Sequence, residues 1–147
     1  MRNISSKTYI AIEVVLYIAC NCGGKTVKTK DICDFQNVTL RYLENIMQAL
    51  VKHKILKSVR GPKGGYILNK DRRRILLSDI FIAMGDIEKY SEKEESPIFD
   101  KITIPLSNDI NNAIRSEFSK ISIQDLYQKL QEEEDPLVSK NISEFVI

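Results

Sequence analysis

Residues 39–53 carry side chains that could contact nucleic acid. Polar, hydrogen-bonding residues recur there at intervals of three or four: Arg41, Asn45, Gln48 and Lys52. This spacing places them on one face of a helix, and their side chains are types that contact base edges and phosphates. Any exposed helix face is polar, which is the plain structural alternative. The face carries no acid except Glu44 at its margin, and this modestly favours nucleic-acid binding.

A second segment with chemical potential is the basic run Arg60-Gly61-Pro62-Lys63-Gly64-Gly65. It separates two short β-type runs, so we expect a hairpin turn with glycines at its permissive positions. A Walker phosphate loop requires a helix after its lysine, and the GXXG clamp of KH domains joins two helices, so both fit poorly. A purely structural hairpin is the remaining alternative, but it leaves the basic tip unexplained.

The sequence has few cysteine and histidine residues that could act in catalysis or bind a metal. The chain has three cysteines and one histidine, and their spacing matches no four-ligand metal or cluster pattern: Cys20, Cys22, Cys33 and His53. The odd cysteine number argues against a paired disulfide framework and indicates a reducing, cytoplasmic location. Structural cysteines are the default, with Cys20 as the candidate redox thiol. No metal, cofactor or enzyme activity is expected, since no nucleophile–base pair can be assembled.

These segments need a small helical core to position them. Apolar periodicity predicts helices over residues 6–21, 30–35 and 39–53, with Thr29 and Thr39 as N-caps of the second and third. The third helix has one apolar stripe: Leu43, Ile46, Met47 and Leu50. Two helices joined by a tight turn and followed by a hairpin describe a winged helix-turn-helix. A short helix capped by Ser78 is expected after the hairpin.

Charge is concentrated in the middle of the chain. Residues 41–74 carry ten Lys or Arg against two acids, net +8, whereas residues 75–147 carry seven against fifteen, net −8. A basic block of this kind suggests a surface for a polyanion, although a solvated basic surface fits equally well on charge alone. No apolar run is long enough to cross a membrane.

The string Ser58-Val59-Arg60-Gly61-Pro62-Lys63-Gly64-Gly65-Tyr66, preceded by Tyr42-Leu43-Glu44, resembles the IscR/NsrR/CymR family (the Rrf-two family) of bacterial winged helix-turn-helix regulators. The resemblance covers residues 1–85 well and the rest by layout. It implies a homodimeric, sequence-specific DNA-binding protein. The expected DNA-binding residues, from the polar face, the basic hairpin and this resemblance together, are Thr39, Arg41, Tyr42, Glu44, Asn45, Gln48, Arg60, Gly61, Lys63 and Gly64.

Two departures from that family stand out. Lys54 occupies a position where relatives usually have a helix-ending glycine. Many relatives bind an iron–sulfur cluster through three cysteines between the winged domain and the long helix, but residues 86–105 here contain neither Cys nor His. The regulator therefore resembles a cluster-free branch, whose signal is a partner protein or the redox state of a thiol.

The C-terminal half offers an apolar helix face. After Pro105, an apolar stripe runs through Leu106 and Ala113 and along the expected dimer residues Ile110, Ile114, Phe118 and Ile121. Such a stripe serves an intradomain core or a dimer interface, and the resemblance favours the dimer. Ser122 and Asp125 form a capping-box pattern that opens a last helix.

The sequence thus predicts a mainly α fold with a small β-hairpin. We expect a winged helix-turn-helix domain over residues 1–85, an acidic loop over 86–104, and a dimerisation helix, last helix and tail over 105–147. The expected function is transcription regulation, as a repressor, by a homodimer on a palindromic operator. The recognition helix is expected in the major groove and the basic wing in the minor groove.

Overall fold

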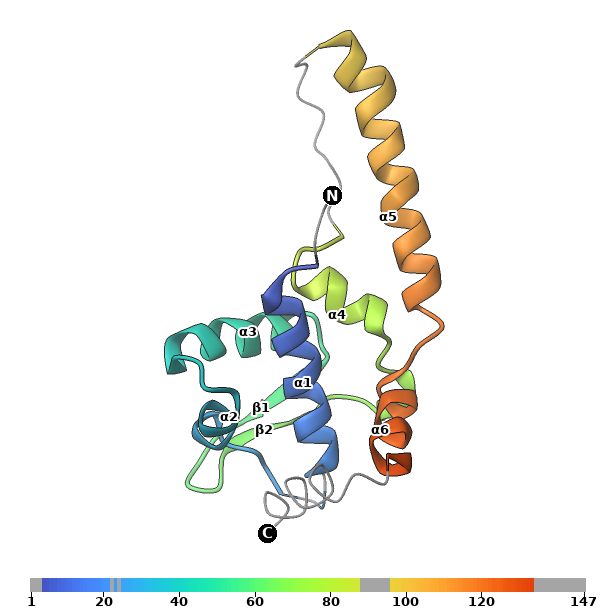
Figure 1. The fold of residues 1–147 in the computed structure, drawn as a ribbon. Helices are drawn as coiled ribbons and strands as arrows, with labels where there is room; N and C mark the ends of the chain where they lie inside the picture. Colours follow the sequence, from blue (N-terminus) through green and yellow to red (C-terminus); the bar gives the residue numbers. More distant parts are fainter. Residues whose placement is uncertain (1–3, 22, 24, 88–95, 134–147) are drawn as a thin grey trace.

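The computed structural model describes residues 4–21, 23, 25–87 and 96–133. Three helices and a hairpin form one layer of the molecule: α1 (Ser6–Cys20), α2 (Thr29–Gln36), α3 (Leu40–Lys52), β1 (Leu56–Val59) and β2 (Gly65–Leu68). The chain then passes through η1 (Arg72–Arg74) and α4 (Leu77–Ala83). It ends with η2 (Phe99–Thr103), α5 (Ile104–Phe118) and α6 (Ile123–Glu132). Figure 1 shows α5 extending away from this body, while α6 returns beside α1. The mainly helical, winged fold is as predicted.

Local signals start α3 and α6. The Thr39 side chain accepts a hydrogen bond of 3.3 Å from the Tyr42 amide at the start of α3. Ser122 and Asp125 form the predicted reciprocal box at α6, with bonds of 2.8 and 3.2 Å. Side-chain oxygens thus satisfy amides that the first turn leaves unpaired, so these two predictions are confirmed.

Two predicted N-caps are wrong. Thr29 lies inside α2, whose cap position is Lys28 and has no side-chain bond. Ser78 is a buried residue within α4, where the Asp79 carboxylate accepts from the Leu76 amide instead, at 3.0 Å. In both places a hydroxyl suited to capping sits one or two residues past the cap position, where the backbone is already helical.

The helix that was expected after Pro105 begins earlier, so the predicted loop over residues 86–104 is wrong at its C-terminal end. A π-helical turn, η2, runs from Phe99 to Thr103 and leads directly into α5. Proline cannot donate a backbone hydrogen bond, but it is tolerated in the first turn, and Pro105 occupies that place in α5. A wide π turn before it lets the chain enter the helix from Phe99 onward.

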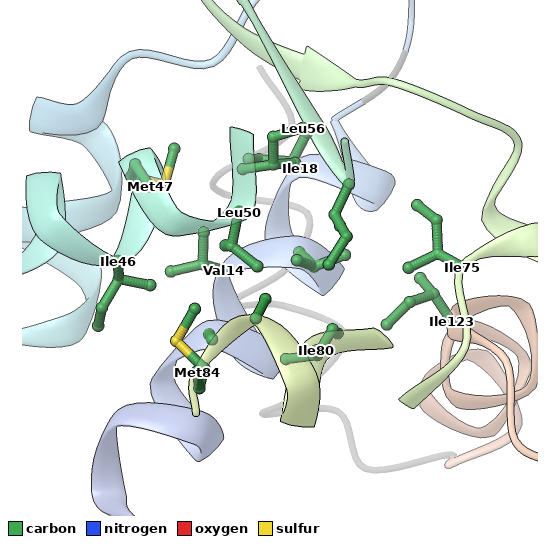
Figure 2. Packing of buried hydrophobic residues seen from close by; sticks show 14 of the residues in the cluster. Val14, Ile18, Ile46, Met47, Leu50, Leu56, Ile75, Ile80, Met84 and Ile123 are labelled. Carbon is green, nitrogen blue, oxygen red and sulfur yellow. The ribbon is translucent and has the colours of Figure 1, made fainter. Parts of the chain in front are cut away.

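The core lies where α1, α3, α4 and α6 meet (Figure 2). The predicted stripe of α3 is fully buried there, with Leu43, Ile46, Met47 and Leu50 all at 0% exposure. Ile123 of α6 is also at 0%, and its amide donates 2.8 Å to the carbonyl of Ile75. The last helix therefore completes the core of the N-terminal domain.

The two strands pair antiparallel, with Leu56 opposite Leu68 and Val59 opposite Gly65. Val27, in the segment between α1 and α2, pairs with Tyr66 of β2 through an isolated antiparallel bridge. Within the described residues, no helix combines the length and apolarity needed to span a bilayer.

Candidate nucleic-acid interface

Helix α3 presents the predicted polar face to solvent. Arg41, Asn45 and Gln48 are exposed, opposite the buried stripe that anchors the helix. Thr39 and Glu44 are exposed beside them, and Tyr42 is 37% exposed. The six residues expected at this helix therefore lie together at one surface that the described part of the chain leaves uncovered.

The turn between α2 and α3 sets the angle of this helix. Asn37 closes α2 in the left-handed conformation, at φ 52°, and its amide donates 3.0 Å to the Cys33 carbonyl. Asparagine tolerates this backbone better than most residues. Cys33 packs half-buried against the core beneath the turn. Burial, and then the carboxylates of Asp34 and Glu44, raise the pKa of its thiol, which disfavours the reactive thiolate.

The wing has the predicted basic tip. Arg60 just before the turn and Lys63 within it are exposed, and the turn is closed by a 2.8 Å bond from the Gly64 amide to the Gly61 carbonyl. Gly61 has φ 112° and open space where a side chain would stand. A Cβ on Gly64 would lie 2.5 Å from the Val59 carbonyl oxygen, so this glycine is required by the wing's own backbone. Of these two glycines, Gly61 is therefore the one with open space beside its backbone.

Sequence reasoning missed Thr26, a residue outside the hairpin that hydrogen-bonds to the wing. Its hydroxyl donates to the carbonyls of Lys63 and Gly64, at 2.6 and 3.2 Å. The neighbouring bridge between Val27 and Tyr66 has bonds of 2.9 and 2.8 Å. No local pattern could have revealed these contacts, because 37 residues separate Thr26 from Lys63.

Leu40 was also missed. This leucine is the first residue of α3 and is 51% exposed, beside the polar face of the helix. It borders a shallow groove between α2 and α3 that Lys30 and Cys33 also line. The signal was available in the sequence, since Leu40 directly follows the predicted cap Thr39.

The structure divides the basic block of residues 41–74 between two faces. Arg72 stacks over the ring of Tyr127 at 4.0 Å, and Lys70 lies 3.7 Å from Asp79. The first contact joins η1 to α6, on the far side of α1 from α3 in Figure 1, and the second joins the preceding residue Lys70 to α4. Only part of the basic block therefore lies near α3.

The predicted dimer stripe on α5 also divides. Ile114, Phe118 and Ile121 pack partly buried against the core of their own chain, and Phe118 stacks on Phe81 with ring centroids 4.6 Å apart. Ile110 is 52% exposed. Further apolar side chains are exposed on the preceding turns of η2 and α5. Their exposed fractions are 73% for Ile98, 60% for Ile102 and 56% for Leu106. We call Ile98, Ile102, Leu106 and Ile110 the outer stripe.

Together, a helix-turn-helix with an exposed polar second helix and a basic hairpin define the class of winged helix-turn-helix DNA-binding proteins. Residues 4–129 match the Rrf2 family, described as iron-dependent transcriptional regulators. The chain belongs to this family and is a DNA-binding transcriptional regulator of the IscR/CymR type, not an enzyme.

Individual relatives agree. The chain is 31% identical to the HTH-type transcriptional regulator IscR of Photorhabdus laumondii over 127 residues, 84% of this chain and 77% of that protein. The structure of T. potens IscR matches with a TM-score of 0.70 and 25% identity, covering 90% of this chain and 91% of that one. CymR, the global cysteine regulator of B. subtilis, shares the fold with a TM-score of 0.67 at 24% identity, over 88% and 98% of the two chains.

The donor set of this chain does not fit a protein-bound iron–sulfur cluster of the family's kind. Residues 86–105 contain no Cys or His, so thiolate and imidazole ligands are absent from that segment. Elsewhere among the described residues, no three His, Cys, Asp or Glu side chains gather where they could hold a metal ion. Cys20 lies half-buried at the end of α1 and Cys33 beneath the α2–α3 turn. Cys22 lies outside the described residues.

Proposed function

We propose that this regulator binds a palindromic operator as a homodimer and represses transcription by occupying it. The observation that carries the proposal is the pairing of two surfaces. The polar face of α3 is exposed, and so is the tip of a thin hairpin, which bears Arg60 and Lys63. The major groove of DNA is wide enough for an α-helix, and a thin basic loop fits the minor groove.

Each group in this surface has a distinct role. Arg41, Asn45 and Gln48 have the donors and acceptors that distinguish base edges in the major groove. Thr39 and Tyr42, at the helix start, are suited to phosphate contact. Glu44 repels phosphate, so its position favours accepting a hydrogen bond from a cytosine amino group.

The wing complements the recognition helix. Arginine is attracted to a narrow, electronegative minor groove, which assigns Arg60 to A·T-rich flanks. Lys63 is assigned to a backbone phosphate, and the open side of Gly61 lets the chain come close to it.

The homodimer rests on the outer stripe. Its four side chains are 52–73% exposed, and covering what remains exposed of each contributes at most about 1.5–3 kcal/mol, the value for burying a fully exposed side chain. A second copy supplies a matching apolar face under two-fold symmetry, which also matches a palindrome. The α5 helices of the two copies would then join two winged domains.

The signal is proposed to act without a cluster held by this chain. Two routes remain: a regulatory partner protein, and oxidation of the Cys20 thiol. Iron and sulfide assays after anaerobic purification test the cluster-free state. Near-stoichiometric iron with a visible charge-transfer band would contradict it.

Genome-wide footprinting with purified protein, with and without reductant, tests the function as a whole. We expect protected sites with two inverted half-sites about one helical turn apart, or a multiple of that distance. Loss of protection without reductant would assign the signal to a thiol. Protection of single, asymmetric half-sites would contradict the palindromic dimer.

A further inference from the structure

The β1–β2 hairpin, which forms the wing, is too small to hold a fixed orientation by itself. It consists of two strands of four residues each, and two-stranded hairpins are marginally stable by themselves. At the tip, one backbone bond joins Gly64 to Gly61. A functional wing therefore needs support from another part of the chain.

That support comes from the segment between α1 and α2. Val27 pairs with Tyr66 through two backbone bonds, as a short third strand would. A Cβ on Gly65 would lie 2.6 Å from the Val27 carbonyl oxygen. Any larger residue at position 65 would therefore clash with the segment that pairs with the wing. Glycine at this position is explained by packing within the protein, without reference to DNA.

Thr26 extends this docking to the tip. Its hydroxyl takes the carbonyls of Lys63 and Gly64 as acceptors, so both oxygens point toward Thr26. A carbonyl oxygen carries partial negative charge and repels phosphate. Two of the tip's carbonyl oxygens are thus held by Thr26, while the Arg60 and Lys63 side chains of the same tip are exposed.

We propose that Thr26 is a positioning residue for DNA recognition, which orders the wing tip so that Arg60 can discriminate the DNA flanks. This inference rests on the proposed function of the wing. Without the hydroxyl, water can satisfy the two carbonyls, so the free protein still folds. The tip must then be ordered during binding, and that cost lowers affinity where the wing makes its contact.

Thr26→Val tests the proposal, because it removes the hydroxyl and keeps the shape. Binding is measured by fluorescence anisotropy on two duplexes that share one operator and differ only in A·T-rich or G·C-rich flanks. We expect affinity for the A·T-flanked duplex to fall about threefold to tenfold, the scale of one hydrogen bond. Affinity for the other duplex should hardly change. The salt dependence should stay the same on both, since no charge is removed.

Two further variants make the result specific. Thr26→Ser keeps the hydroxyl and should retain the wild-type ratio of affinities. Thr29→Val is the matched control, since this threonine lies three residues on and no hydrogen bond joins its side chain to the described part of the wing. Thermal unfolding checks that each variant is folded, and Thr26→Ala replaces Thr26→Val if the valine folds poorly.

The outcomes separate this inference from the function it rests on. If Thr26→Val keeps the wild-type ratio while Arg60→Ala loses it, the wing reads the flanks and the inference about Thr26 is wrong. A Thr26→Val loss that is equal on both duplexes also overturns it, because the residue is then merely structural. If Arg60→Ala keeps the ratio, the minor-groove role of the wing fails, and the inference fails with it.

Discussion

Helices α3 and α5 are both amphipathic, but the chain treats their apolar faces in opposite ways. The stripe of α3 is completely covered within the chain, and its polar face is the exposed one. On α5, Phe118 at one end reaches the core, while Ile98 and Ile102, just ahead of the helix, are 73% and 60% exposed. The chain therefore covers one apolar face completely and leaves part of the other exposed, where we propose that a second copy packs.

The difference follows from where each helix stands. Helix α3 packs against both α1 and α4, so neighbours are present on its apolar side. α5 leaves the body of the domain, and only its C-terminal turns remain within reach of α4. Contiguous exposed apolar side chains of this kind mark interaction sites in soluble proteins.

The largest effect is expected from charge on the outer stripe. Ile102→Asp combined with Ile110→Asp should convert a dimer of twice 16.9 kDa into a monomer, because two buried carboxylates per chain cannot be accommodated in an apolar interface. Affinity for a palindromic operator should fall at least about a hundredfold, since two linked half-sites bind with avidity. Sedimentation and anisotropy measure the two effects.

Asn108→Asp is the matched control for that pair. It adds a carboxylate to the exposed opposite side of α5 and should leave both the mass and the affinity unchanged. A double-aspartate variant that remains dimeric would show that the interface lies elsewhere.

The next effect concerns the wing. Arg60→Ala should cost about 1–3 kcal/mol in binding, with the greatest loss on A·T-rich flanks. Lys63→Ala removes the same charge from the same tip, but should weaken all sequences alike and lower the salt slope by about one. Titrations at several salt concentrations separate the two. Identical behaviour of both variants would mean that neither side chain enters the minor groove.

Glu44→Ala should change specificity without loss of affinity. If Glu44 accepts from a cytosine, the variant should lose about 1–3 kcal/mol of discrimination at one base position. Overall affinity should be equal or higher, because an acid near a polyanion has been removed. A panel of single-base operator variants provides the measurement. A uniform fall in affinity with specificity unchanged would show Glu44 to be structural.

Leu40→Ala should show a smaller effect with a distinctive signature. An exposed leucine at the start of the recognition helix is placed to contact a thymine methyl group. Replacing one thymine of the half-site by deoxyuridine should then cost the wild type about 0.8 kcal/mol, the value of one buried methyl group. Leu40→Ala should be insensitive to the same replacement. Equal sensitivity in the two proteins would exclude the contact.

The smallest effect is expected at Lys54, which joins α3 to the wing. Its φ of 60° is left-handed. The Lys54 and Ile55 amides donate 3.0 Å to Val51 and Leu50, a Schellman helix end. Lys54→Gly should raise the free energy of unfolding by a few tenths to about 1 kcal/mol, because glycine relieves the left-handed strain but loses more chain entropy.

Urea unfolding measures the change at Lys54 through the midpoint at constant slope. Lys54→Ala is the control, since it removes the same charge and retains the left-handed strain. Equal stabilisation by both variants would assign the effect to charge.

The sequence by itself determined the elements whose causes are local. Thr39 and Ser122 act on amides within one helical turn, so their caps could be predicted from spacing alone. The apolar stripe of α3 and the basic tip of the wing could be predicted for the same reason, because both depend on residue type at fixed intervals. Even the left-handed Lys54 was anticipated, from its place in a family pattern.

Only the tertiary structure decided which surfaces meet. The docking of Thr26 on the wing and the burial of Ile123 join residues far apart in the chain, and no local spacing encodes either contact. The same holds for α5, whose single apolar stripe is divided between the core and solvent by the direction in which the helix leaves the domain. Hydrophobic burial is non-directional, so an apolar pattern predicts that a face will be covered but leaves its partner to the packing of the whole chain.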